Sequence, residues 1–243
     1  MTVLTIIRYR KRFILFALLA MAIHRLPLWF NKKISFYKLM GSGKNGTFDK
    51  TPDWQQWAIF SVMNDETGNL KTDLLKKLYG SFIAKWFLFF KCETWTVLLE
   101  PLEGHGSWDR KKPFGDLPRQ SDYEGTIAVL TRASIRISKL NAFWKHVDGI
   151  ASKMATANGF ITSFGIGEMP WLKQATFSIW QNKESMKQFA YSMQEHKEVI
   201  VKTRRDKWYS EDMFTRFRII YSSGTIKGID PLASLNYSAT FAN

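Results

Sequence analysis

Residues 106–114 read Gly-Ser-Trp-Asp-Arg-Lys-Lys-Pro-Phe, and residues 224–232, which lie 118 positions later, read Gly-Thr-Ile-Lys-Gly-Ile-Asp-Pro-Leu. The two segments share the first glycine, a hydroxyl-bearing residue after it, and a proline followed by an apolar residue. Glu93 and Glu211 are separated by the same 118 positions. Because chance matches scatter over many separations, this agreement indicates two copies of one structural unit.

The duplication extends toward the N-terminus with one change of spacing. Arg8 and Arg132 are 124 positions apart. The matches keep their order along the chain, and the change of spacing requires one sizeable insertion or deletion in the loop after Gly43. The sequence therefore predicts a first repeat in residues 1–120 and a second in residues 121–243. A functional site can then exist in one repeat and be absent from the other.

Each repeat shows the same order of strands and helices. In the second repeat the hydrophobic pattern predicts strands at 126–131, 160–166, 174–180 and 213–221, and helices at 140–151 and from 184 to about 207. The first repeat gives strands at 3–7, 35–40, 57–63 and 93–99, with helices that begin at Lys11 and near Leu70. Gly159 is a typical helix end and Asn182 a typical N-cap residue. This βαββαβ order predicts an α+β fold of two ferredoxin-like repeats, whose four-stranded antiparallel sheets pack face to face.

Composition and charge limit the class of protein. Hydrophobic residues make up 45% of the 243 residues and aromatic residues 15%, which is typical of a globular chain. The net charge of +14 favours an anionic partner, which can be a phospholipid surface, a nucleic acid or an acidic redox protein. Basic residues are spread along the chain, which argues against nucleic acid. Cys92 is the single cysteine, so no intrachain disulfide can form and a cytoplasmic location is predicted.

The N-terminal segment 13–23 is apolar and follows a basic stretch at 8–12. It is too short to span a bilayer, which takes about 20 apolar residues. No small-residue cleavage motif follows it, and its counterpart at 138–155 in the second repeat has the pattern of an amphipathic helix. We therefore expect a buried first helix. A signal sequence or a membrane anchor remains the alternative, and such a helix could also dip into a membrane surface, which predicts a peripheral place at the inner face of the membrane.

Few sequence motifs point to chemistry. The histidines are too far apart for a local zinc pattern, and no P-loop, nucleophile elbow or dinucleotide fingerprint occurs. The glycine-rich segment 41–46 lies between two predicted strands rather than before a helix, so a tight loop is favoured over a phosphate cradle.

His196 is the candidate metal ligand. It shares one face of the predicted helix 184–207 with Phe189, Met193 and Ile200, whereas the first repeat has Leu78 at the corresponding place. A histidine on an apolar helix face is placed as the axial ligand of a haem iron would be. The alternative is a buried histidine bonded to a carbonyl group. Cys92 is the other conceivable iron ligand, although a structural cysteine is favoured there.

Arg216 is the candidate catalytic residue. It alternates along its strand so that it shares a face with Phe214. If that face lines a cavity, the guanidinium charge can stabilise bound oxygen or a haem propionate. The alternative is a structural ion pair with Glu211 or Asp212.

Several segments resemble the spheroidene monooxygenase family. They are 39–43 (Leu-Met-Gly-Ser-Gly), 177–180 (Phe-Ser-Ile-Trp), 208–217 (Trp-Tyr-Ser-Glu-Asp-Met-Phe-Thr-Arg-Phe) and 228–232 (Gly-Ile-Asp-Pro-Leu), together with His196. The resemblance implies a haem-containing carotenoid ketolase that uses O2 and reduced ferredoxin. It also implies a fold akin to the dimeric α+β barrels that hold haem by a helix histidine.

The resemblance sets the expected site. His196 would bind the haem iron and Arg216 would lie near the haem edge or the oxygen. The aromatic side chains of Phe177, Trp180, Trp208 and Phe214 would exclude water and hold a linear carotenoid. Two alternatives stay open, namely a cofactor-free protein of the same fold that binds or oxidises a small apolar ligand, and a non-enzymatic protein associated with the membrane.

Overall fold

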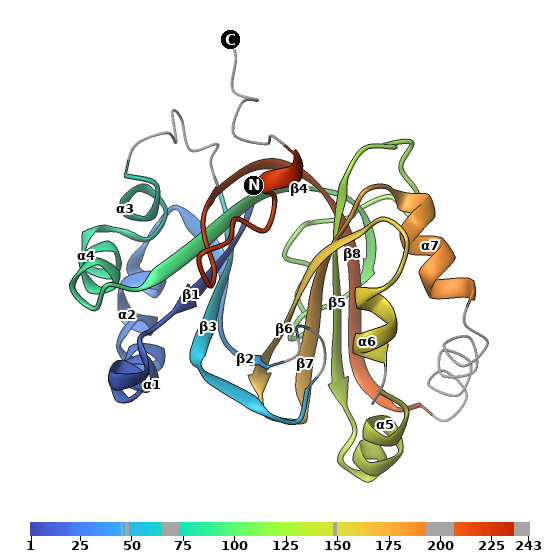
Figure 1. Ribbon diagram of the computed structural model, residues 1–243, viewed down its shortest axis with the longest axis horizontal. Helices are drawn as coiled ribbons and strands as arrows, with labels where there is room; N and C mark the ends of the chain where they lie inside the picture. Colours follow the sequence, from blue (N-terminus) through green and yellow to red (C-terminus); the bar gives the residue numbers. More distant parts are fainter. Residues whose placement is uncertain (45, 47–48, 65–72, 148–149, 193–206, 236–243) are drawn as a thin grey trace. The chain divides into compact units, whose positions relative to one another are not determined.

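The computed structural model describes all residues except 45, 47–48, 65–72, 148–149, 193–206 and 236–243 (Figure 1). The first repeat contains strands β1 (Thr2–Arg8), β2 (Ile34–Gly43), β3 (Pro52–Met63) and β4 (Glu93–Gly106), and helices α1 (Ile14–Ile23), α2 (Arg25–Phe30), α3 (Leu74–Tyr79) and α4 (Ser81–Phe89). The second contains strands β5 (Ile127–Ile135), β6 (Phe160–Met169), β7 (Lys173–Trp180) and β8 (Tyr209–Gly224), and helices α5 (Leu140–Val147), α6 (Ile150–Ala155) and α7 (Lys183–Ser192). Short 3-10 turns occupy Lys11–Phe13, Ile137–Lys139 and Ala233–Leu235.

The strand order confirms the predicted fold class. Hydrogen-bonded neighbours follow β4-β1-β3-β2 in the first repeat and β8-β5-β7-β6 in the second, which is the ferredoxin-like order in both. Together the eight strands give the closed order β1-β3-β2-β6-β7-β5-β8-β4 of an α+β barrel. The central strands β1 and β5 pair antiparallel on both sides, and nearly all of their side chains are buried.

The compact units of the fold do not coincide with the repeats. One unit comprises residues 1–41, 53–100 and 220–243, and the other comprises residues 42–52 and 101–219. The strand β4 therefore passes from the first unit into the second after Glu100, and β8 passes back after Ile219. The boundary between repeats near residue 120 stays a prediction about the duplication.

The repeated turn that marks the sequence is held by the repeated glutamate. Residues 108–111 and 226–229 each close a tight turn whose two central residues have positive φ, as in the type I′ turns that suit hairpins. The carboxylate of Glu211 accepts hydrogen bonds from the Ser107 hydroxyl at 2.7 Å and the Asp109 N–H at 3.1 Å. The carboxylate of Glu93 likewise accepts them from the Thr225 hydroxyl at 2.9 Å and the Lys227 N–H at 2.8 Å. The matching positions in sequence therefore correspond to a matching contact.

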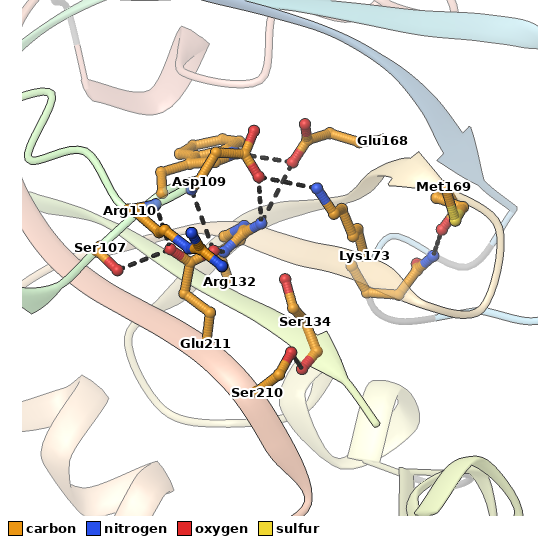
Figure 2. Close-up of polar contacts among 12 residues, drawn as sticks. Ser107, Asp109, Arg110, Arg132, Ser134, Glu168, Met169, Lys173, Ser210 and Glu211 are labelled. Carbon is orange, nitrogen blue, oxygen red and sulfur yellow. Dashed lines mark hydrogen bonds and ion pairs between the residues drawn. The ribbon is translucent and has the colours of Figure 1, made fainter. Parts of the chain in front are cut away.

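The second copy of this contact includes a buried arginine (Figure 2). Arg132 is 1% exposed and lies among the carboxylates of Asp109, Glu168 and Glu211, with its guanidinium bonded to Glu211. The guanidinium carbon lies 5.4 Å from the centre of the Trp108 ring. Burial alone would raise the pKa of Glu211, but its bonds to Arg110, Ser107 and Arg132 lower that pKa to about 2. These contacts tie together β5, β8 and the turn after β4.

The first helix differs from the sequence-based expectation. The helices α1, α2 and α4 gather on one side of β1 and β3 (Figure 1). Only a narrow stripe of α1 and α2 is buried, formed by Ala17, Ala20 and Leu28, together with His24 between the helices. Large apolar side chains such as Leu15 and Trp29 are exposed. The prediction of a buried first helix is therefore wrong for most of its surface.

Candidate functional site

One face of the second-repeat sheet is apolar and covered by α6 and α7. Antiparallel pairing sets Ile127 of β5 opposite Trp180 of β7 and Val129 opposite Arg216 of β8, so these side chains share a face. Trp180 is 1% exposed, and its ring lies 5.4 Å from that of Phe160. The same cluster contains Met154 of α6, Met186 and Phe189 of α7, and Phe214 of β8. The indole N–H of Trp180 donates to the Ser178 hydroxyl at 3.0 Å.

α7 begins where the sequence predicts it. The Ser185 N–H donates to the Asn182 side-chain oxygen at 2.8 Å, which confirms Asn182 as the N-cap. The helix then places Phe189 over Trp180, with ring centres 5.2 Å apart. Residues beyond Ser192 fall in the part of the chain that the structure leaves undescribed.

A buried charge cluster lies on the same face. Glu103 of β4 is 2% exposed and bonds through its carboxylate to the guanidinium of Arg216. The same carboxylate accepts a hydrogen bond at 2.8 Å from the Lys183 amine and one at 2.6 Å from the Ser121 N–H. Two cations therefore share one carboxylate, and the three side chains carry a net charge of +1. Such a cluster favours an anion.

Arg216 retains hydrogen-bonding capacity. Its Nε atom is buried and has no hydrogen-bond partner among the described residues. The guanidinium carbon lies 4.8 Å from the centre of the Phe214 ring. Burial lowers the pKa of Arg216, but an arginine stays protonated in proteins. The partner of Arg216 is Glu103, so the alternative pairing with Glu211 or Asp212 does not describe its main contact.

His105 joins the site and was missed by the sequence analysis. It is exposed and stacks on the Phe214 ring, with ring centres 5.7 Å apart. His105 lies two positions after Glu103 on β4, so the two side chains point to the same face of the strand. That alternation was readable in the sequence, but its partners on β8 are more than 100 residues away.

The structure brings together some of the predicted residues and separates others. Trp180, Phe214 and Arg216 share the helix-covered face. Phe177 is fully buried, but it stands three positions before Trp180 on β7 and therefore faces the other way. Trp208 packs in a different cluster, beneath α5. His196 lies outside the described residues.

Comparisons with known proteins give the family. The chain is 34% identical over 217 residues to the spheroidene monooxygenase of Rhodobacter capsulatus, which covers 88% of this chain and 87% of that relative. It is 32% identical over 225 residues to the spheroidene monooxygenase of Cereibacter sphaeroides, which covers 92% of this chain and 67% of that relative. The chain belongs to the spheroidene monooxygenase family. No model of a described protein family matches the sequence.

A solved structure supports the fold of the present chain. An aldoxime dehydratase crystallised with butyraldoxime superposes with a TM-score of 0.57 at 8% identity. The match covers 90% of this chain and 78% of that one. At this identity the likeness concerns the fold alone.

The family resemblance implies a haem, and the described face fits part of what a haem needs. Haem needs a ligand to its iron and an apolar enclosure, and its propionates favour nearby cations. The Trp180 cluster supplies the apolar side chains, and Arg216 supplies a partly buried cation whose Nε donor is unsatisfied among the described residues. No group of three or more potential metal-ligating side chains occurs among the described residues. A haem, however, requires only one protein ligand at its iron. The proposed ligand, His196, lies outside the described residues.

Two other side chains of the present chain, Cys92 and His24, are poorly placed to bind a haem iron. Cys92 packs against the apolar cluster of the first repeat, which is separate from the Trp180 cluster, and burial raises the pKa of its thiol to about 12. Burial lowers the pKa of His24 to about 4, and its imidazole is packed against the rings of Trp86 and Phe87 at 5.4 Å each. The cavity beside His24 is about 10 Å³, which is near the minimum for one water molecule. A haem does not fit there.

Proposed function

We propose that the protein is a haem-dependent monooxygenase that oxidises a linear carotenoid with O2. Membership of the spheroidene monooxygenase family supports the reaction class and the substrate class. The observation that carries the haem is the partly buried Arg216, whose buried Nε donor has no partner among the described residues and lies in a net positive cluster beside an apolar wall. That combination suits an amphiphilic cofactor with an apolar ring and anionic side groups.

Each residue has a proposed part. His196 would hold the haem iron, and Arg216 would donate a hydrogen bond to a haem propionate or to the O2 substrate. Trp180 and Phe214 exclude water and align the polyene chain. Glu103 and Lys183 fix the guanidinium of Arg216 in place, because the carboxylate bonds to both cations. Phe177 and Trp208 support the walls from outside this face, Phe177 through β7 and Trp208 through the start of β8.

The overall chemistry balances with an external reductant. The haem supplies oxygen activation when it is bound. One oxygen atom of O2 enters a C–H bond of the carotenoid to give an alcohol. The other oxygen atom takes up two electrons from the reductant and two protons, and leaves as water. A second insertion at the same carbon gives a geminal diol, which loses water to form a ketone. A ferredoxin-type protein is the proposed electron donor, since the charge of +14 attracts an acidic partner. The proposed location is the cytoplasm, with peripheral contact at the inner face of the membrane.

An absorption spectrum with matched histidine variants tests the haem. The purified wild-type protein should show a Soret band, and His196→Ala should lose it. His105→Ala is the control, because that imidazole stacks on the same aromatic wall and should leave the band intact. Loss of the band only in His105→Ala would move the ligand to β4. A colourless wild-type protein that oxidises its substrate at full rate would contradict the proposal and favour the cofactor-free alternative.

A further inference from the structure

Helices α1 and α2 direct most of their large apolar side chains outward. Ala17 and Ala20 face the sheet, whereas Leu15, Leu19 and Trp29 are exposed. A helix on the surface of a globular protein normally shows the opposite arrangement, with large apolar residues inside. The outer surface of this helix pair is therefore built for an apolar environment.

The C-terminal half of α4 continues this surface. Leu88 is 79% exposed and Phe89 is 77% exposed. The ring of Phe90 connects the two helices, because it lies 4.8 Å from that of Phe16 and 4.9 Å from that of Phe89. Ten of the fifteen exposed large apolar side chains that the structure describes belong to α1, α2 and α4, namely Leu15, Phe16, Leu18, Leu19, Leu26, Trp29, Phe30, Phe82, Leu88 and Phe89. We call these ten side chains the apolar surface.

The charges within the segments that carry the apolar surface are all of one sign. Residues 10–33 and 81–92 contain no aspartate or glutamate. They contain eight exposed basic residues, which are Arg10, Lys11, Arg12, Arg25, Lys32, Lys33, Lys85 and Lys91. Aromatic and leucine side chains flanked by lysine and arginine match the two layers of an anionic lipid surface, because the apolar groups enter the acyl region and the cations meet the headgroups.

We propose that the apolar surface docks the protein on an anionic lipid bilayer, with α1, α2 and α4 lying in the interfacial plane. The segment Lys11–Phe30 is long and apolar enough to cross a membrane by length and composition. However, Ala17, Ala20, His24 and Leu28 are buried against the rest of the first unit, so lipid can reach this segment from one side only. This proposal deepens the peripheral contact included in the proposed function, but it rests on exposure and charge and is independent of the haem.

Vesicle co-sedimentation of the full chain tests the docking. The wild-type protein should bind vesicles of phosphatidylglycerol and phosphatidylcholine, and should bind pure phosphatidylcholine vesicles much more weakly. The double variant Leu88→Gln/Phe89→Gln should bind the anionic vesicles about tenfold more weakly or worse, because two exposed apolar side chains no longer enter the bilayer. Ile137→Gln is the control, since Ile137 is 77% exposed but lies in the second repeat, and it should bind like the wild type.

Other results would overturn the docking. Equal binding of the double variant and the control would exclude the apolar surface as the contact. Retention of the wild type in membranes after an alkaline carbonate wash would indicate a spanning segment. A dimer that Leu88→Gln/Phe89→Gln dissolves, with no vesicle binding by the wild type, would assign the surface to a second copy of the chain. Turnover of carotenoid in detergent separates this proposal from the proposed function, because the double variant should keep the wild-type rate there.

Discussion

Arg132→Leu should lower the free energy of unfolding at pH 7 by about 3–5 kcal/mol, as expected when one partner of a buried ion cluster is removed. The variant leaves Asp109, Glu168 and Glu211 without the guanidinium that lies among them. The Lys173 amine still bonds to Asp109 at 2.8 Å, but among the described residues it forms no ion pair with Glu211. Urea unfolding followed by circular dichroism measures the loss.

The loss of stability caused by Arg132→Leu should depend on pH. The pKa of Glu211 falls from 4.5 to about 2 in the folded protein, so its stabilising effect is present above pH 4.5 and is lost as the pH falls toward 2. Without Arg132 part of that lowering disappears. The wild type and the variant should therefore differ most at pH 7 and converge toward pH 2.

Arg8→Leu is the matched control for Arg132→Leu, because Arg8 is the counterpart of Arg132 in the first repeat. The side chain of Arg8 is 20% exposed and bonds to Asp53 at 2.7 Å. Loss of a partly exposed pair should cost about 1 kcal/mol or less. Equal losses for the two variants would contradict the account of Arg132 as the centre of a buried cluster.

Glu103→Leu should destabilise the protein by about 3–5 kcal/mol, because it removes a carboxylate that is 2% exposed, leaves the partly buried Arg216 without its counterion and removes one partner of Lys183. Arg216→Leu should cost a similar amount by leaving the carboxylate with Lys183 alone. The double variant Glu103→Leu/Arg216→Leu should recover much of the loss, since an apolar pair of similar volume often replaces a buried ion pair at little cost. A double-mutant cycle in urea gives the coupling energy.

Glu184→Leu is the control for this cycle. Glu184 lies beside Lys183, but its side chain is 69% exposed and approaches Lys187 only to 4.0 Å. We expect a change below about 0.5 kcal/mol. Additive losses for Glu103→Leu and Arg216→Leu, with no recovery in the double variant, would contradict a direct coupling of the two side chains.

The repeated order of strands and helices was predictable because it rests on local patterns. The apolar, strand-forming composition of β1 and β5, the N-cap Asn182 and the Glu93–Glu211 spacing are each visible in a short stretch or in the repeat itself. The lengths of β4 and β8 were not predictable. The expected strands 93–99 and 213–221 extend in the structure to Glu93–Gly106 and Tyr209–Gly224. Their additional residues are polar or interrupted by Pro101, and pairing with distant strands, rather than local propensity, keeps them extended.

The candidate site was partly predictable for the same reason. Phe214 and Arg216 were selected from local alternation and Trp180 from the family resemblance, and the structure places all three on one face. Glu103 was missed because it is 113 positions from Arg216 and no local pattern joins the two. The inverted pattern of α1 was present in the sequence, but its meaning depends on which side of the helix meets the sheet.

Incorporation of labelled oxygen tests whether the protein is a carotenoid monooxygenase. The full-length protein would be supplied with spheroidene in lipid vesicles, a reduced ferredoxin and ¹⁸O2, and the carotenoid products would be analysed by mass spectrometry. The account predicts hydroxylated and keto products whose new oxygen carries the label. Products that form at the same rate without O2, with oxygen drawn from the solvent, would contradict it.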